Sequence, residues 1–154
     1  MAISITIEIN RDFTVPASFD EVFDLLSDVP ASGSHFPKVD QLVDLGDNSY
    51  RWEMEKIGVD KHALQSIYAC HYVSDKAAGS IVWKPIKGEG NGLVSGNWKI
   101  TPVDEGTHIV FTTEAKMTLP LPSLLKLAIS PVVKHEFNSL IDTYTKNLKA
   151  EFSS

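Results

Sequence analysis

One long apolar stripe with the spacing of an α-helix runs through the C-terminal part of the chain. Its members recur at intervals of three or four residues: Ile129, Val133, Phe137, Leu140, Tyr144 and Leu148. This spacing places them on one face of a single long helix. Pro131 lies inside the stripe. Because proline removes a backbone hydrogen bond and clashes with the preceding turn, we expect a kink or a break near Ser130, with residues 122–130 acting as a gate.

Most of the chain before this helix is predicted to form short antiparallel strands. Residues 3–9 alternate between isoleucine and polar side chains, which is typical of a half-buried strand. Turns rich in glycine, aspartate and asparagine separate the other expected strands: 41–45, 49–57, 63–73, 80–85, 92–101 and 107–117. These links are short enough for antiparallel neighbours, so the pattern predicts a sheet of about seven strands.

A short helix is predicted between the first strand and the others. Pro16 ends the strand, and Ser18 with Glu21 has the spacing of a capping box. The apolar face of this helix is supplied by Val22, Phe23, Leu25 and Leu26. Residues 28–37 contain two prolines and a glycine, so we expect a loop or one further helical turn there.

These patterns together predict one α+β domain over residues 1–154, in which a curved antiparallel sheet of about seven strands wraps around the long C-terminal helix, with short helices after the first strand. A net charge of −6 without a Lys/Arg cluster argues against binding to nucleic acid. No apolar run approaches the roughly 20 residues that cross a bilayer, and the N-terminus lacks a signal-peptide pattern. Membrane insertion is therefore not expected, and a cytoplasmic location is the default.

The expected inner faces of the strands combine aromatic with mildly polar side chains. A buried hydroxyl without a partner costs about 1–3 kcal/mol, so several of them on one concave face favour a cavity that holds water or a ligand. The tryptophans can equally be plain core, because each buries roughly 150–250 Å². The side chains that we expect to contact a ligand are Trp52, Met54, Tyr68, Cys70, Tyr72, Trp83, Trp98, Phe111 and Thr113 on the strands, His35 and Phe36 in the loop after the first helix, and Val133 and Phe137 on the C-terminal helix.

Signals for catalysis or metal binding are weak. The histidines lack metal-ligand spacing, and the single cysteine, Cys70, allows neither an internal disulfide nor a Cys-based zinc site, so no cofactor or metal is expected. A buried lone cysteine is more often packing than a nucleophile. Glu114 is directed outward by alternation, although a one-residue bulge would turn it inward as a candidate base. The glycine-rich stretch 88–92 favours a hairpin over a phosphate-binding loop. We assign no catalytic residue.

Several segments carry a resemblance to a known family: VPASFDEVF at 15–23 with LSD at 26–28, FPKV at 36–39, and GNWKITP at 96–102 with GTHI at 106–109. With the order of elements, they make the whole chain similar to the START-like (SRPBCC) superfamily, specifically its polyketide cyclase/dehydrase and lipid-transport branch, which has the helix-grip fold. The resemblance implies an elongated cavity between the sheet and the C-terminal helix, used by relatives to hold lipids, hormones, sterols or polyketides.

Three hypotheses of function follow from the pattern and the resemblance together. The first is binding or transport of a small hydrophobic molecule of the lipid, sterol or aromatic polyketide class. The second is a polyketide cyclase/dehydratase-like enzyme, in which Tyr68, Tyr72 or His35 orients the substrate. The third is a partner-binding module like the chaperone activators of the superfamily, which is expected to expose a large apolar patch. A small hydrophobic ligand is the expected partner, and a homodimer stays open.

Overall fold

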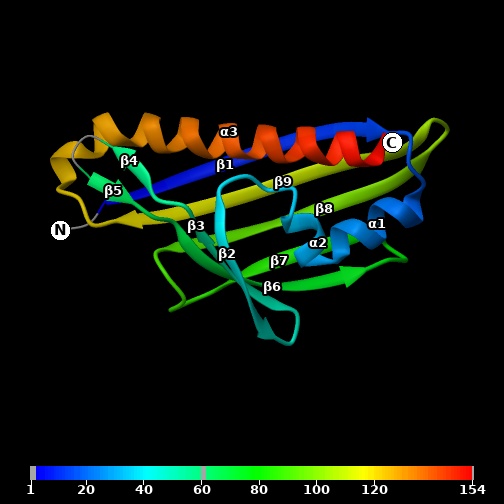
Figure 1. The fold of residues 1–154 in the computed structure, drawn as a ribbon, viewed down its shortest axis with the longest axis horizontal. Coiled ribbons are helices and arrows are strands. Elements are labelled where there is room, and N and C mark those ends of the chain that lie inside the picture. Colours follow the sequence, from blue (N-terminus) through cyan, green and yellow to red (C-terminus); the bar gives the residue numbers. More distant parts are fainter. Residues whose placement is uncertain (1–2, 60–61, 154) are drawn as a thin grey trace.

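Seven antiparallel strands form one sheet in the order β1-β9-β8-β7-β6-β3-β2, and β4 with β5 forms a separate pair (Figure 1). The computed structural model describes residues 3–59 and 62–153. The strands are β1 (Ile3–Val15), β2 (Val39–Gly46), β3 (Ser49–Met54), β4 (Ile57–Val59), β5 (His62–Leu64), β6 (Ile67–Asp75), β7 (Ser80–Ile86), β8 (Gly92–Val103) and β9 (Gly106–Leu119). The helices are α1 (Phe19–Ser27), α2 (Val29–Gly33), a 3-10 turn η1 (Ser123–Leu125) and α3 (Lys126–Phe152).

The first and last strands pair along their whole lengths and provide the surface on which α3 lies. The isoleucine alternation of β1 keeps Ile3, Ile5, Ile7 and Ile9 buried, and it continues to Val15, further than the predicted range. Arg11 of β1 donates from Nε to Asp142 of α3 at 2.8 Å and from Nη2 to Asn138 at 2.9 Å. Figure 1 shows α3 running beside β1 along the sheet. The predicted helix-grip architecture is therefore confirmed.

Of the kink or break predicted near Ser130, the break is wrong, because α3 is continuous from Lys126 to Phe152 with Pro131 inside it. The carbonyl that would accept from the N–H missing at Pro131 belongs to Leu127, four residues earlier. Leu127 is 91% exposed, so water can reach the end of the helix where this carbonyl lies. The buried side of α3 follows the predicted stripe and adds further members; it comprises Ile129, Val133, Ile141, Tyr144, Thr145, Leu148 and Phe152.

Two predicted long strands, 49–57 and 63–73, are each interrupted in the structure. β3 ends at Met54 and β6 begins at Ile67, and the short β4–β5 pair lies between them. The Asn91 side chain stabilises the backbone where the strands are interrupted. Its Oδ1 accepts from the Ile67 N–H and its Nδ2 donates to the Gln65 carbonyl, each at 2.9 Å. The Gln65 side chain in turn donates to the Met54 carbonyl at 2.9 Å. These side-chain bonds replace the regular ladder that two unbroken strands would need.

The local signals around the first helix and the first hairpin are confirmed. Ser18 caps α1 by accepting from the Glu21 N–H at 3.2 Å, and residues 29–33 form the one further helical turn. The turn between β2 and β3 has positive φ at Gly46, Asp47 and Asn48, where glycine and asparagine are the favoured residues. These turns set the hairpin registers.

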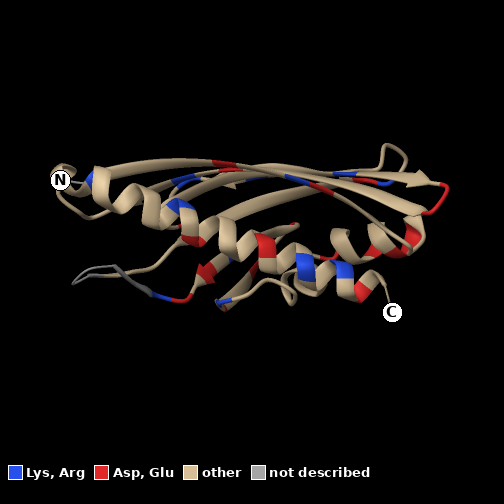
Figure 2. Ribbon diagram, turned by 90° about the horizontal axis from the view of Figure 1, so that it is seen from above, with Lys and Arg blue, Asp and Glu red and all other residues tan. Residues whose placement is uncertain are grey.

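Charged residues of both signs are interspersed along α3, as Figure 2 shows, and neither sign gathers on one stretch of that helix. Among the described helices, none combines the length and the apolar character that a membrane span requires. No group of three or more potential metal-ligating side chains occurs among the described residues.

Candidate functional site

A small cavity of about 60 Å³ lies between the inner face of the sheet and α3. Its walls come from the sheet, from α3 and from the α1–α2 segment, and most of them are aromatic or aliphatic. The strands contribute Trp52, Tyr68, Cys70, Tyr72, Trp83, Val94, Trp98, Phe111 and Thr113; α3 contributes Phe137, Ile141 and Tyr144; and the α1–α2 segment contributes Leu26, Val29, Ser32 and Phe36. We call this space the central cavity.

A second cavity of about 40 Å³ lies closer to the N-terminal half of α3. Its lining adds Lys38, Met54, Glu55, Leu64, Ser66, Val133, Glu136 and Leu140. Phe36, Tyr68 and Phe137 border both spaces. These three aromatic side chains therefore form the partition between the central cavity and this side cavity.

The predicted ligand-contacting residues lie largely together. Ten of them border the central cavity: Phe36, Trp52, Tyr68, Cys70, Tyr72, Trp83, Trp98, Phe111, Thr113 and Phe137. Met54 and Val133 border the side cavity instead. The role of all these residues in ligand binding stays a prediction, but strand alternation placed those on the strands on the correct face.

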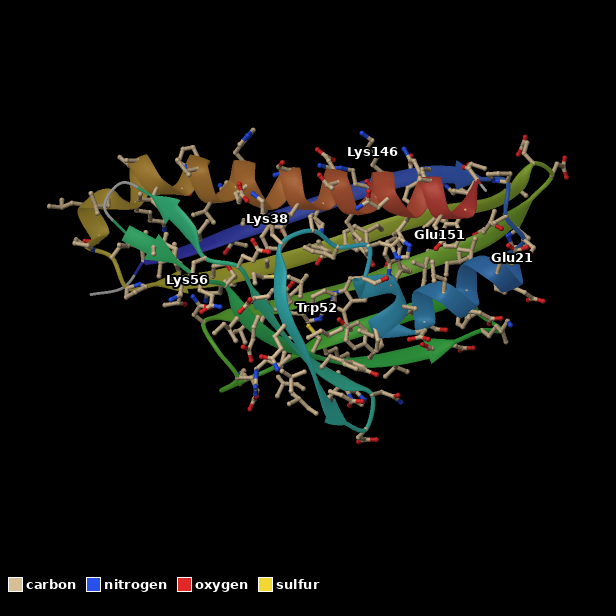
Figure 3. The ribbon with its side chains drawn as sticks, in the orientation of Figure 1. Glu21, Lys38, Trp52, Lys56, Lys146 and Glu151 are labelled. Atoms are coloured by element: carbon tan, nitrogen blue, oxygen red, sulfur yellow. The ribbon has the colours of Figure 1, made fainter. Side chains whose placement is uncertain are left out.

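His35 borders neither cavity. Its ring Nδ1 lies 3.0 Å from the Ala31 carbonyl, and its Nε2 lies 3.3 Å from Glu151 Oε1 near the end of α3. Figure 3 shows Glu151 on that last part of α3, close to the α1–α2 segment. The imidazole therefore ties α2 to α3 and is directed away from the cavities.

Ser32 and Tyr144 are site residues that the sequence reasoning did not include. Both are buried, and their hydroxyls form a hydrogen bond with each other across the central cavity's wall. Tyr144 already belonged to the predicted helix stripe, so its inward direction had a signal. Ser32 had none, because the direction of a one-turn helix depends on how it packs.

Most polar atoms of the central cavity are satisfied within the protein. Trp52 Nε1 donates to the Tyr72 hydroxyl at 2.9 Å, and Cys70 Sγ donates to the Val94 carbonyl at 3.3 Å. Thr113 Oγ1 donates to the Ser95 carbonyl at 3.0 Å. The expectation that several inward hydroxyls need water or a ligand is therefore wrong for these groups, because neighbouring strands provide their partners.

Burial keeps these groups protonated. Desolvation raises the pKa of Tyr68, Tyr72 and Tyr144 above the ordinary 10.0 of a tyrosine. It also raises the pKa of the Cys70 thiol from 9.0 to about 12. At neutral pH the tyrosines are hydrogen-bond donors and Cys70 is a thiol, which disfavours a nucleophilic role for it.

Among the described residues, charged side chains border the side cavity but not the central cavity. Among the described residues that border the central cavity, none is Asp, Glu, Lys, Arg or His. At the side cavity, Lys38 Nζ lies 3.0 Å from Glu136 Oε1, an ion pair that joins the loop after α2 to α3. Figure 3 shows Lys38 on that loop, facing α3.

The other titratable candidates lie outside the site. Glu114 is exposed on the outer face, and the pairing of β9 with β1 and β8 is unshifted around it, so no bulge turns it inward. His71 Nδ1 lies 3.0 Å from Ser49 Oγ, and His108 Nδ1 lies 3.0 Å from Thr14 Oγ1. Neither histidine borders the two cavities.

The predicted gate is only half present. None of the residues 122–130 borders either cavity, whereas Phe36 borders both. Phe36 also lines a surface groove of about 400 Å³ between α2 and β2. Its ring packs against Tyr144 and Trp52, with centroid distances of 4.8 and 5.6 Å. Phe36 is thus the common wall of the groove and of both internal spaces.

Comparison with known proteins gives a family and a fold. The family described as polyketide cyclase/dehydrase and lipid transport matches residues 6–153. No curated protein sequence matches this chain significantly.

Solved structures with the same architecture share little sequence with this chain. A START superfamily protein from Mycobacterium smegmatis is 16% identical, with a TM-score of 0.63 and coverage of 94% of this chain and 96% of that one. A conserved protein from Geobacillus kaustophilus is 17% identical, with a TM-score of 0.64 and 94% of each chain covered. The di-domain aromatase/cyclase StfQ of the steffimycin biosynthetic pathway is 17% identical, with a TM-score of 0.62 over 97% of this chain and 51% of that one. At these identities the likeness is one of fold.

Proposed function

The chain belongs to the polyketide cyclase/dehydrase and lipid transport family, and from this premise we propose that it binds or transports a small hydrophobic molecule between its sheet and α3. The observation that carries the proposal is the lining of the central cavity. Aromatic and aliphatic side chains form most of it, the described residues bring no charged group to it, and nearly all its polar atoms are bonded within the protein. Such a surface favours an apolar occupant.

Binding requires the partition between the two cavities to move. Volumes of about 60 and 40 Å³ are well below the roughly 300–1,000 Å³ of a site for a drug-sized ligand. Phe36 and Phe137 of the partition are only half-buried, so their rings can turn with less loss of packing than a core residue. Displacing them joins the two cavities into one.

The enzyme hypothesis has less support. Acid–base catalysis requires a group with a pKa near the working pH within hydrogen-bonding reach of the substrate. His35 is directed away from the cavities, and burial raises the pKa of Tyr68 and Tyr72. These groups can orient a ligand, but they are poor proton-transfer groups at neutral pH.

The partner-binding hypothesis rests on exposed apolar residues in η1 and at the start of α3. Leu124 and Leu127 are 92% and 91% exposed, and Val132 is 46% exposed. Exposed apolar side chains in ones and twos are common on soluble proteins, and a docking surface is usually a larger contiguous patch. The cavity is therefore the better-supported site.

Filling the central cavity is expected to remove ligand binding without unfolding the protein. Val94 borders this cavity and is 5% exposed, so Val94→Phe places a ring in the space at an overpacking cost of about 1–3 kcal/mol. We expect the fluorescence titration with N-phenyl-1-naphthylamine, a neutral apolar probe, to show at least a roughly tenfold weaker affinity for this variant.

The matched control is Val110→Phe, which makes the same substitution on the outer, half-buried face of β9. It should retain the affinity of the unmodified protein, and circular dichroism should show that both variants are folded. Equal affinities of Val94→Phe and the unmodified protein would contradict the proposal. So would failure of the unmodified protein to bind the probe, together with a native mass spectrum free of co-purified small molecules.

Removing the Phe36 ring is expected to speed ligand entry. Phe36→Ala opens the surface groove to both cavities, so a step that limits association is lost and the association rate constant should rise by roughly tenfold. Stopped-flow fluorescence with the same probe measures this rate. Phe19→Ala is the control, because Phe19 is also half-buried but packs against Phe23, away from the cavities. An unchanged rate for Phe36→Ala would show that ligands enter elsewhere.

A further inference from the structure

The hydroxyl of Tyr68 differs from the other polar groups of the cavities. Tyr68 is 6% exposed, and its side chain borders both the central and the side cavity. Its ring stacks on Trp52, with centroids 6.2 Å apart and planes inclined by 17°. The described residues provide its hydroxyl with no hydrogen bond, and none of their fully enclosed side-chain oxygens lacks a partner. The hydroxyl therefore opens onto the cavities.

The other hydroxyls and the thiol are already engaged. The Tyr72 hydroxyl accepts from Trp52, Cys70 donates to the Val94 carbonyl, and the hydroxyls of Tyr144 and Ser32 are bonded to each other. Thr113 donates to a carbonyl of β8. Among the described residues that border the central cavity, Tyr68 is thus the one whose hydroxyl takes part in no hydrogen bond within the protein.

The surroundings restrict what can accept this hydrogen bond. Burial favours the protonated form of Tyr68, so the group donates. The described lining of the central cavity provides no cation to pair with a carboxylate and no anion to pair with an amine. At the side cavity, which Tyr68 also borders, Lys38 and Glu136 are already paired with each other. A charged ligand would lose its hydration without compensation. A neutral molecule with one acceptor oxygen satisfies the donor and leaves the rest of its surface against the aromatic walls.

We propose that Tyr68 determines the specificity of this site, its hydroxyl donating a hydrogen bond to a single carbonyl-type oxygen of a neutral, otherwise apolar ligand. The proposal rests on the proposed function, because it requires that the cavities take up a ligand. It adds a chemical class: ketones and related neutral oxygen acceptors are selected over hydrocarbons and over carboxylates of the same shape. The flat rings of Trp52 and Tyr68 beside this oxygen favour a planar skeleton next to the carbonyl.

The test compares two ligands of nearly the same shape, acetophenone and α-methylstyrene, in which a C=O replaces a C=CH2 group. Isothermal titration measures both with the unmodified protein and with Tyr68→Phe. Tyr68→Phe is expected to weaken acetophenone binding by about tenfold and to leave α-methylstyrene within roughly twofold, because the lost donor matters only to the ligand with an acceptor. Benzoate is expected to bind neither protein.

Tyr72→Phe is the matched control, since the Tyr72 hydroxyl is already bonded within the protein. It should change the affinities for the two ligands by the same factor. An independent readout is the infrared C=O stretch of bound acetophenone, which should lie at lower frequency in the unmodified protein than in Tyr68→Phe. That shift in the unmodified protein, relative to acetophenone in hexane, tests the hydrogen bond even if a variant does not fold.

Three results overturn the proposal. An equal loss for both ligands in Tyr68→Phe would mean a packing role, and an unshifted C=O stretch would mean that no hydrogen bond forms. Tighter binding of benzoate than of acetophenone would reject the neutral class. Each of these leaves the proposed function intact, whereas failure of both ligands to bind the unmodified protein would reject the proposed function itself.

Discussion

Replacing Gly96 by alanine is expected to lower the free energy of unfolding by about 3 kcal/mol or more. Gly96 in β8 is the cross-strand neighbour of Trp83 in β7. A Cβ atom at this position would lie 2.3 Å from the Thr112 carbonyl oxygen and 2.6 Å from Cζ2 of Trp83. Both distances are far inside van der Waals contact, so one of the two groups has to move.

Neither group can move easily. The Thr112 carbonyl belongs to the backbone of β9, which pairs with β8 and β1 on its two sides. The Trp83 ring is enclosed by the rings of Tyr72, Trp98 and Phe111, at centroid distances of 6.0, 6.3 and 5.7 Å. All four of these rings also border the central cavity, so the substitution should disturb binding as well as stability.

Urea denaturation of Gly96→Ala and of a control variant measures the effect. Gly88→Ala is the control, because its Cβ would meet no atom within 4 Å although φ is +88°. Only backbone strain is expected there, at a cost of roughly 1–2 kcal/mol. Equal losses in the two variants would show that the contact with Trp83 and Thr112 relaxes freely, which would contradict the close packing inferred around Gly96.

The protein is also expected to lose stability steeply in alkaline solution. The folded state keeps the proton on Cys70, whose pKa is raised from 9.0 to about 12, and on Tyr68, Tyr72 and Tyr144, whose pKa values are raised above 10.0. The unfolded chain releases these protons near the ordinary values. Above pH 9.0 for the thiol, and above pH 10.0 for the tyrosines, the folded state therefore binds more protons than the unfolded state.

The sign of the effect follows from this difference in bound protons. Stability is fully present below the unfolded pKa values and falls as the pH rises above them, by about 1.4 kcal/mol per pH unit for each group. With all four groups engaged the slope approaches roughly 5 kcal/mol per pH unit. Because domains of this size are stable by roughly 5–15 kcal/mol, unfolding is expected within a few pH units above the tyrosine threshold.

Urea unfolding at a series of pH values measures the slope, and tyrosinate absorbance reports the ionisation directly. Tyr68→Phe is the informative variant, because it removes one retained proton without breaking a hydrogen bond. Its slope should be shallower by about 1.4 kcal/mol per pH unit. A free energy of unfolding that stays constant through this range would mean that the tyrosines ionise in the folded protein. That result would contradict the burial of their hydroxyls around the cavity.

Local patterns determined much of this protein from the sequence alone. The isoleucine alternation of β1, the capping pair Ser18 and Glu21, the turn at 46–48 and the stripe of α3 all depend on neighbours within a few residues. Their outcomes could be predicted because period and turn chemistry act over such short distances. The same alternation directed the aromatic side chains of the strands to the inner face.

Tertiary structure determined the features that depend on solvent exposure or on contacts between residues far apart in the sequence. Asn91 interrupts β3 and β6 through bonds to residues 24 and 26 positions away. Solvent around the start of α3 lets the helix continue through Pro131. His35 is drawn away from the cavities by Glu151, 116 positions along the chain.

The same division applies to the inner face of the sheet. The alternation established that Tyr68, Tyr72 and Thr113 point inward, whereas only the fold decided which of their hydroxyls find partners. The reason is physical, since a strand's period sets the direction of a side chain, but a hydrogen bond needs a partner that another strand or helix must bring within about 3 Å. That is why the unused donor of Tyr68 became visible only once the chain was folded.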